Sequence, residues 1–263
     1  MPAGLKIAWG PAYLPVTGGD FTYSLMFVAR NEVTDEYWVV IRGTNPISLP
    51  SWFAEDFHVD HTRPFDLFVP GLDKKIQISD ASHKGMKDLL SLQDPQDGGR
   101  LVDFLKGVFP GYLYVTGHSL GGTLVPPLFA YLNAILGTKP TMRCWSFAGL
   151  TTGNAEFADY INGLVTWDQW RIVNSLDVIP LMFWNKDGLY SIYDYDPKWE
   201  DLEPVLTYIN HLFEVAKRHG YVQPGGLLTL PGTKVLGLDY VGELLSQHIH
   251  TTYLQLVEQH FPL

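Results

Sequence analysis

Positive charge is scarce in this 263-residue chain, which carries 18 Lys and Arg residues against 28 Asp and Glu residues. The formal net charge is −10 at pH 7. Nucleic acids need a basic footprint that neutralises their phosphates, so no nucleic-acid partner is expected. The same balance disfavours electrostatic docking on anionic membranes, although it does not exclude apolar contact with a lipid surface.

Cysteine is almost absent. Cys144 is the only one, which excludes an intramolecular disulfide, and no Cys-x-x-Cys or Cys/His zinc spacing occurs. His58, Asp60 and His61 lie close together in the sequence, but no further ligand is positioned by spacing. We therefore expect neither a metal nor another cofactor.

Long hydrophobic runs are also missing. No run approaches about 18 uninterrupted apolar residues, so no transmembrane segment is expected. No signal peptide is visible, because the first residues lack a charged region followed by an apolar core. A cytoplasmic protein fits this pattern, and so does a secreted protein whose leader is missing. Without linker-like or repeated segments, we expect one domain over residues 1–263.

Strands alternate with helices through the middle of the chain. Buried-type strands are expected at 112–116, 142–147 and 169–174, and helices at 120–136 and 155–164. This alternation predicts a mostly parallel sheet with helices on its faces, which is the α/β class.

The flanking regions have other patterns. Residues 21–30 and 36–43 are β-branched and aromatic runs that predict a hairpin. Apolar residues recur with a helical period over 200–219, and residues 243–260 also predict a helix. The Gly- and Pro-rich segment 222–237 predicts a loop.

The pentapeptide Gly117-His118-Ser119-Leu120-Gly121 fits the G-x-S-x-G pattern and stands between a strand and a helix. A sharp turn there would place Ser119 in a strained conformation, with glycines where side chains would collide. The next helix points its N-terminus at the turn, where free N–H groups favour an oxyanion. This context favours a nucleophile over an ordinary helix-capping serine.

A triad needs an acid and a base, which follow the nucleophile in the order Asp and then His in α/β-hydrolases. Asp177 is the acid candidate, because it follows the strand at 169–174 on the edge where open α/β sheets hold their sites. His248 and His250 remain as base candidates. The residue pattern alone does not choose between them.

The oxyanion needs two backbone donors. The strand that ends in Gly43-Thr44 supplies one candidate loop, in which the Thr44 N–H can donate. The N–H of Leu120, next to the nucleophile, is the second candidate.

A lid is expected directly after this loop. Residues 45–58 place Trp52, Phe53 and Phe57 beside acidic residues, a composition that suits an apolar, mobile segment over a substrate pocket. A short packed helix accounts for the same pattern equally well.

Six motifs in order resemble the class 3 lipases, the family of the filamentous-fungal triacylglycerol lipases. They are V-V-I-R-G-T at 39–44, S-W at 51–52, H-K-G-M at 83–86, G-H-S-L-G-G at 117–122, D-V-I-P at 177–180 and H-T-T-Y at 250–253. The resemblance implies an α/β-hydrolase fold with a short helical lid after the oxyanion loop. It also implies hydrolysis of lipid or carboxylic esters without a metal.

The resemblance also assigns roles to single residues. It makes Ser119 the nucleophile and Asp177 the acid, and it makes Thr44 the oxyanion residue with the Leu120 amide as its partner. It selects His250 as the base, because the family pattern His-x-x-Tyr is met there and not at the other candidate.

The chain departs from the family in places. Trp52 resembles the lid tryptophan, but Pro126 and Pro127 follow the nucleophile within its helix, where they remove hydrogen bonds and predict a kink. The spacing between Asp177 and His250 exceeds that of the fungal enzymes. Extra elements in this interval are expected to wall the pocket.

We therefore expect a serine hydrolase, a triacylglycerol lipase or carboxylesterase, that contacts a lipid–water interface through its lid. The same triad serves phospholipase A1, feruloyl esterase and acyltransferase reactions, which differ by the shape of the pocket. The alternative from another class is a non-catalytic hydrolase-like binding protein. Such proteins usually lack a triad member, and every candidate is present here.

Overall fold

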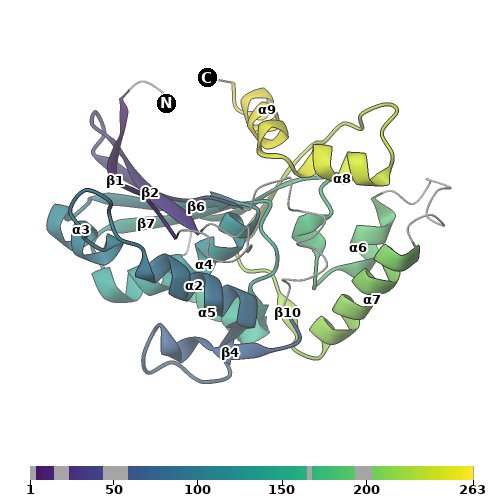
Figure 1. Cartoon of the computed structure of the whole chain (residues 1–263), viewed down its shortest axis with the longest axis horizontal. Helices are drawn as coiled ribbons and strands as arrows, with labels where there is room; N and C mark the ends of the chain where they lie inside the picture. The colour runs from purple at the N-terminus through teal and green to yellow at the C-terminus, as the bar shows by residue number, and fades with distance from the viewer. Residues whose placement is uncertain (1–3, 15–23, 44–58, 165–167, 193–202, 263) are drawn as a thin grey trace.

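The computed structural model describes the chain except for residues 1–3, 15–23, 44–58, 165–167, 193–202 and 263. A central sheet lies between layers of helices, and a smaller sheet stands beside it (Figure 1). The strand order of the central sheet is β1-β2-β3-β6-β7-β9-β11.

Its first strands run antiparallel to one another. They are β1 (Leu5–Tyr13), β2 (Leu25–Asn31) and β3 (Glu36–Ile41). The hairpin of β2 and β3 confirms the one predicted from the aromatic and β-branched runs. β1 was not predicted, and its pairing with β2 shifts register on both sides of Trp9.

From β3 onward every neighbouring pair is parallel. The strands are β6 (Tyr112–His118), β7 (Thr141–Phe147), β9 (Gln169–Asn174) and β11 (Gly226–Leu230). Leu113, Tyr114 and Val115 are all buried in β6, as expected for a central strand covered on both faces. The sheet is therefore mostly parallel, in agreement with the predicted α/β class.

The smaller sheet has the order β10-β8-β5-β4. Its strands are β4 (Thr62–Pro64), β5 (Gln77–Ser79), β8 (Gly153–Asn154) and β10 (Tyr221–Val222), and the 3-10 turn η2 (Phe65–Leu67) follows β4. Phe65, Ile78 and Phe157 pack together beneath it.

Helices cover one face of the central sheet. They are α2 (Asp80–Ser91), α3 (Leu101–Val108), α4 (Leu120–Leu136) and α5 (Ala155–Leu164). Val39, Val115 and Leu128 are fully buried between the strands and these helices. α4 carries few polar residues and is buried along most of its length, so it forms the centre of this layer.

The helix α4 runs unbroken through Pro126 and Pro127. A proline inside a helix lacks the N–H that would bond the carbonyl four residues earlier. The helix nevertheless continues past both prolines, so other groups must satisfy those carbonyls. The predicted kink, a change in direction of the helix axis, stays a prediction.

A separate group of helices caps the edge where the parallel strands end. It comprises η3 (Ile179–Leu181), α6 (Lys186–Ser191), α7 (Glu203–Lys217) and α8 (Tyr240–His248). Ile179, Leu212 and Phe213 share one apolar cluster there. The prediction of a helix at 200–219 is thus confirmed by α7.

The last helix, α9 (His250–His260), lies on the opposite face of the sheet from α2, α4 and α5 (Figure 1). Leu256 packs there on Ile172 and Leu230. The helical structure predicted at 243–260 is confirmed, but it forms two helices, because α8 ends at His248 and Ile249 adopts an extended conformation. The predicted loop at 222–237 is partly wrong, because it contains β11. Within the described residues, no helix is both long and apolar enough to cross a membrane.

Candidate active site

Ser119 stands at the turn between β6 and α4. Its backbone has φ 58° and ψ −124°, a conformation that residues with side chains rarely adopt. The turn is secured by hydrogen bonds from Ser119 N to the Phe147 carbonyl (2.9 Å) and from Thr123 N to the Ser119 carbonyl (2.9 Å). The Ser119 side chain makes no capping hydrogen bond to α4, so its hydroxyl is not used as a helix cap.

Two glycines allow the backbone to pack this closely. A Cβ at Gly117 would lie 2.7 Å from the carbonyl carbon of Gly121. A Cβ at Gly43 would lie 3.2 Å from the Cβ of Ser119, which brings the end of β3 against the turn. Side chains at either position would displace Ser119, because real Cβ atoms do not approach backbone so closely.

Asp177 lies just after β9 and is almost completely buried. Its Oδ1 accepts a hydrogen bond from the Ile179 N–H (3.0 Å). Its Oδ2 accepts from His248 Nδ1 (2.8 Å) and from the Tyr253 hydroxyl (2.7 Å). Three donors therefore fix the plane of the carboxylate.

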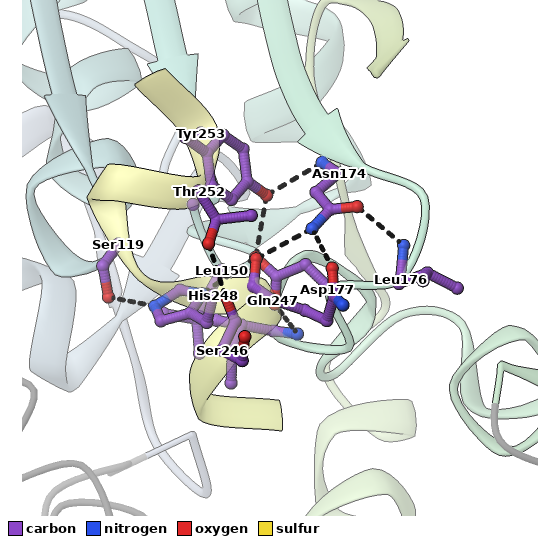
Figure 2. Close-up of polar contacts among 12 residues, drawn as sticks. Ser119, Leu150, Asn174, Leu176, Asp177, Ser246, Gln247, His248, Thr252 and Tyr253 are labelled. Atoms are coloured by element: carbon purple, nitrogen blue, oxygen red, sulfur yellow. Dashed lines mark hydrogen bonds and ion pairs between the residues drawn. The ribbon is translucent and has the colours of Figure 1, made fainter. Parts of the chain in front are cut away.

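His248 connects the acid to the serine (Figure 2). Its Nδ1 faces Asp177 and its Nε2 lies 2.8 Å from Ser119 Oγ, with the ring fully buried at the end of α8. Because Asp177 accepts at Nδ1, the proton of a neutral ring belongs there, and Nε2 is left to accept from the serine hydroxyl.

The prediction that His250 is the base is wrong. His250 is exposed at the first position of α9, whereas His248 forms both of the contacts that a base requires. The extended residue Ile249 separates the two and turns the chain from the cap toward the far face of the sheet. Of the two candidates left open by the residue pattern, His248 is the one that contacts both Asp177 and Ser119.

Tyr253 explains why the His-x-x-Tyr pattern of the family pointed to His250. Its hydroxyl donates to Asp177 and accepts from the Asn174 N–H (2.9 Å), so this tyrosine does belong to the site. Burial, and then the negative charge of Asp177, raise the pKa of Tyr253 well above its ordinary value, which keeps the hydroxyl protonated as a donor. Because the helix breaks at Ile249, the histidine that shares Asp177 with Tyr253 is His248, five residues before the tyrosine, and not His250, three residues before it.

A buried polar network holds the end of α8 in place. The Asn174 amide donates to both the carbonyl (2.9 Å) and the side-chain oxygen (2.8 Å) of Gln247. The Gln247 amide in turn donates to the Thr233 carbonyl (2.8 Å) and to Glu243 (2.9 Å). The network fixes the residue next to His248, and no local motif in the sequence marks its members (Figure 2).

His118 was not assigned a role from the sequence. Its ring centroid lies 5.0 Å from that of His248 and 5.2 Å from that of Tyr253. Burial, followed by repulsion from His248, lowers the pKa of His118 from 6.5 to about 3. The ring beneath the base is therefore uncharged at neutral pH.

The remaining predicted residues divide into two groups. Leu120 begins α4, so its N–H is among those at a helix start that have no intrahelical acceptor. Thr44, Trp52, Phe53 and Phe57, together with the lid candidate 45–58, lie outside the described residues.

The residue after Ser119 connects two apolar clusters. Leu120 is half-buried and packs against both the main core and the cluster of the cap. Leu181, Leu244 and Leu245 are also partly buried against the cap cluster. The apolar cluster of the cap thus reaches Leu120, the residue that follows Ser119. In the described part of the chain, no group of three or more His, Cys, Asp or Glu side chains is placed to hold a metal ion.

Comparison with known proteins adds independent information. The family model described as "Lipase (class 3)" matches residues 38–186, which is more than half of the chain. Among solved structures, M37 lipase is 28% identical with a TM-score of 0.81, over 96% of this chain and 78% of that one. The overall arrangement is therefore that of the α/β-hydrolase fold.

Two fungal structures are more distant and support the fold alone. Nonglycosylated LIP2 lipase of Yarrowia lipolytica is 17% identical with a TM-score of 0.58, over 87% of this chain and 67% of that one. The lipase from Rhizopus microsporus var. chinensis is 15% identical with a TM-score of 0.55, over 86% of this chain and 62% of that one. No curated protein sequence gives a significant match.

Proposed function

The chain belongs to the class 3 lipase family, and on that premise we propose that it hydrolyses lipid carboxylic esters through Ser119, His248 and Asp177. The observation that carries the proposal is the position of His248, whose two ring nitrogens lie 2.8 Å from Asp177 Oδ2 and 2.8 Å from Ser119 Oγ. The whole chain acts as one catalytic domain in this proposal.

Acylation begins with the serine hydroxyl. His248 Nε2 takes the proton of Ser119 Oγ as that oxygen attacks the ester carbonyl. Asp177 holds the other ring nitrogen and stabilises the imidazolium that forms. The same imidazolium then protonates the departing alcohol, which leaves an ester between Ser119 and the acyl group.

The oxyanion of the tetrahedral intermediate needs preorganised donors. The N–H of Leu120 is one, because it stands next to the nucleophile at the positive end of α4. We assign the second to the N–H of Thr44, which follows Gly43 at the end of β3, itself packed on Ser119. Water activated by His248 then attacks the acyl-enzyme and releases the acid.

The apolar cluster of the cap, against which Leu120 packs, supports a lipid ester as substrate. Leu120 and the partly buried leucines of the cap offer apolar surface for an acyl chain. Residues 45–58, with Trp52, Phe53 and Phe57, are proposed as the lid that contacts a lipid–water interface. No observation favours phospholipase A1, feruloyl esterase or acyltransferase activity over hydrolysis of triacylglycerols or simple carboxylic esters.

Covalent labelling tests the proposal most directly. A fluorophosphonate probe should modify the peptide that contains Ser119, detected by mass spectrometry, and Ser119→Ala should remove the label. Labelling of another residue, or none at all, would contradict the proposed nucleophile. Rates on p-nitrophenyl esters of increasing chain length, with and without an emulsion, would then separate an esterase from a lipase.

A further inference from the structure

Two consecutive prolines sit inside the helix that carries the nucleophile. Pro126 and Pro127 are both buried in α4. Each lacks the N–H that would otherwise bond the carbonyl four residues earlier, so the carbonyls of Gly122 and Thr123 lose their intrahelical donors. These carbonyls belong to the first turn of α4, directly after Ser119.

Each of these two carbonyls has a side-chain hydroxyl as its donor instead. Ser146 Oγ, from β7, donates to the Gly122 carbonyl (2.9 Å). Thr152 Oγ1, from the residue before β8, donates to the Thr123 carbonyl (2.7 Å). Ser146 and Thr152 are both buried, so no bulk water competes for these carbonyls.

A third hydroxyl completes the connection to the nucleophile. Thr123 Oγ1 donates to the Ser119 carbonyl (3.1 Å) and accepts from the Leu150 N–H (2.9 Å). The Ser119 carbonyl also receives the Thr123 N–H at 2.9 Å. The first turn of α4 is thus held by contacts to β7 and to the segment that follows it, where an ordinary helix would use its own N–H groups.

We propose that Ser146 and Thr152 are positioning residues for the nucleophile. Their hydroxyls replace the two helical hydrogen bonds that the prolines remove. This inference rests on the proposed function, because the position that they control is that of Ser119 and of the Leu120 N–H. The pairing is specific: Ser146 replaces the donor lost at Pro126, and Thr152 replaces the donor lost at Pro127.

Removing either hydroxyl leaves a buried carbonyl without a donor. The first turn of α4 then shifts so that the carbonyl can reach another donor, and Ser119 and the Leu120 N–H move with it. Misplacement of reacting groups by about 1 Å can cost on the order of a hundredfold in rate. Because the residues do not touch substrate, the loss should fall on kcat and leave KM nearly unchanged.

The first experiment measures kcat and KM on a soluble p-nitrophenyl ester for Ser146→Ala and Thr152→Val. Each variant should lower kcat about ten- to a hundredfold with KM within about twofold of the wild type. Thr152→Ser, which keeps the hydroxyl, should recover most of the activity. Thr116→Val is the matched control, since it removes another hydroxyl-to-carbonyl bond (2.9 Å to Trp145) away from α4, and its kcat should stay near that of the wild type.

The second experiment restores the missing N–H groups. Pro127→Ala should rescue Thr152→Val, and Pro126→Ala should rescue Ser146→Ala, because each alanine N–H can bond the orphaned carbonyl. The crossed pairs, Pro126→Ala with Thr152→Val and Pro127→Ala with Ser146→Ala, should remain impaired in kcat. If Thr152→Val alone does not fold, the contrast is read from Ser146→Ala, whose matched pair with Pro126→Ala should recover kcat and whose crossed pair with Pro127→Ala should not.

Two results would overturn the inference. One is a loss of thermal stability in Ser146→Ala and Thr152→Val with unchanged kcat, which would make these hydroxyls structural only. The other is equal rescue by matched and crossed pairs. Fluorophosphonate labelling of wild-type Ser119 is measured first, so a labelled wild type with insensitive variants rejects this inference while the proposed nucleophile stands.

Discussion

Ser119 and His248, the proposed nucleophile and base, come from regions of the chain that are built in opposite ways. Ser119 lies on a turn whose strand, glycines and helix are consecutive in the chain. His248 lies at the end of a helix whose position depends on Asn174 and Gln247, and on Tyr253 beyond a break at Ile249. A local geometry is visible in a short motif, whereas a geometry made by tertiary contacts is not.

The difference extends to what each side tolerates. At the turn, backbone atoms lie so close that Gly117 and Gly43 have no room for a Cβ. Around the base, side chains carry the contacts, and the polar groups near Asp177 satisfy one another. We therefore expect substitutions at the Ser119 turn to reduce activity by steric collision, and substitutions around His248 to reduce it by removing hydrogen bonds.

The largest expected effect comes from the nucleophile itself. Ser119→Ala removes the attacking oxygen while leaving the glycine turn intact. It should lower kcat on a p-nitrophenyl ester on the order of 10⁴- to 10⁶-fold without changing the melting temperature strongly. Near-normal turnover by this variant would show that Ser119 is not the nucleophile.

The second test separates the two histidines. His248→Ala should lower kcat on the order of 10⁴-fold, because it removes the group that takes the serine proton. His250→Ala alters an exposed side chain and should leave kcat within about twofold of the wild type. The reverse result, with His248→Ala active and His250→Ala inactive, would restore the base implied by the family spacing.

A smaller effect is expected from the tyrosine that shares Asp177 with the base. Tyr253→Phe removes a hydrogen bond to a carboxylate and leaves the Asn174 N–H without its acceptor. Because part of this interaction serves folding, we expect about a three- to tenfold loss in kcat together with a lower melting temperature. An unchanged melting temperature and kcat would mean that the carboxylate does not need this donor.

The smallest effect concerns acid stability. The pKa of His118 is lowered to about 3 in the folded chain by burial and then by His248. In the unfolded chain the His118 ring takes up a proton near pH 6.5, whereas in the folded chain it stays neutral down to about pH 3. Its contribution to the free energy of unfolding is therefore complete above pH 6.5 and is lost as the pH falls toward about 3. Melting temperatures of wild type and His118→Asn between pH 7 and pH 4 should therefore converge or cross, with the wild type losing more. Parallel curves would contradict the lowered pKa.

Much of the fold was predictable because its strands are long and apolar. β6, β7 and β9, and the helices between them, fall close to the predicted ranges. β1 was missed because Gly10 and Pro11 interrupt its pattern, and β11 because it follows Pro224 and Gly225 in a segment that resembles a loop. Both are edge strands of the central sheet, and an edge strand depends on pairing with a neighbour that its own residues do not reveal.

A residue of the candidate site was predictable when its position depends on neighbouring residues in the sequence, and not when it depends on tertiary contacts. Ser119 and Asp177 follow buried strands, and parallel strands bring their carboxyl ends to one edge of the sheet. The choice between His248 and His250 required the break at Ile249, yet residues 243–260 contain neither glycine nor proline to mark it. The break arises because α8 packs in the cap and α9 packs on the sheet.

The two prolines of α4 also have a consequence for the order of folding. The first turns of this helix contain Gly121 and Gly122 and lack the donors of Pro126 and Pro127, so the segment has little tendency to be helical by itself. Its stabilising partners, Ser146 and Thr152, come from a strand and a loop that follow it in the chain. The turn at Ser119 should therefore consolidate late, after β7 has docked, and regain of esterase activity should lag behind the far-UV signal during refolding.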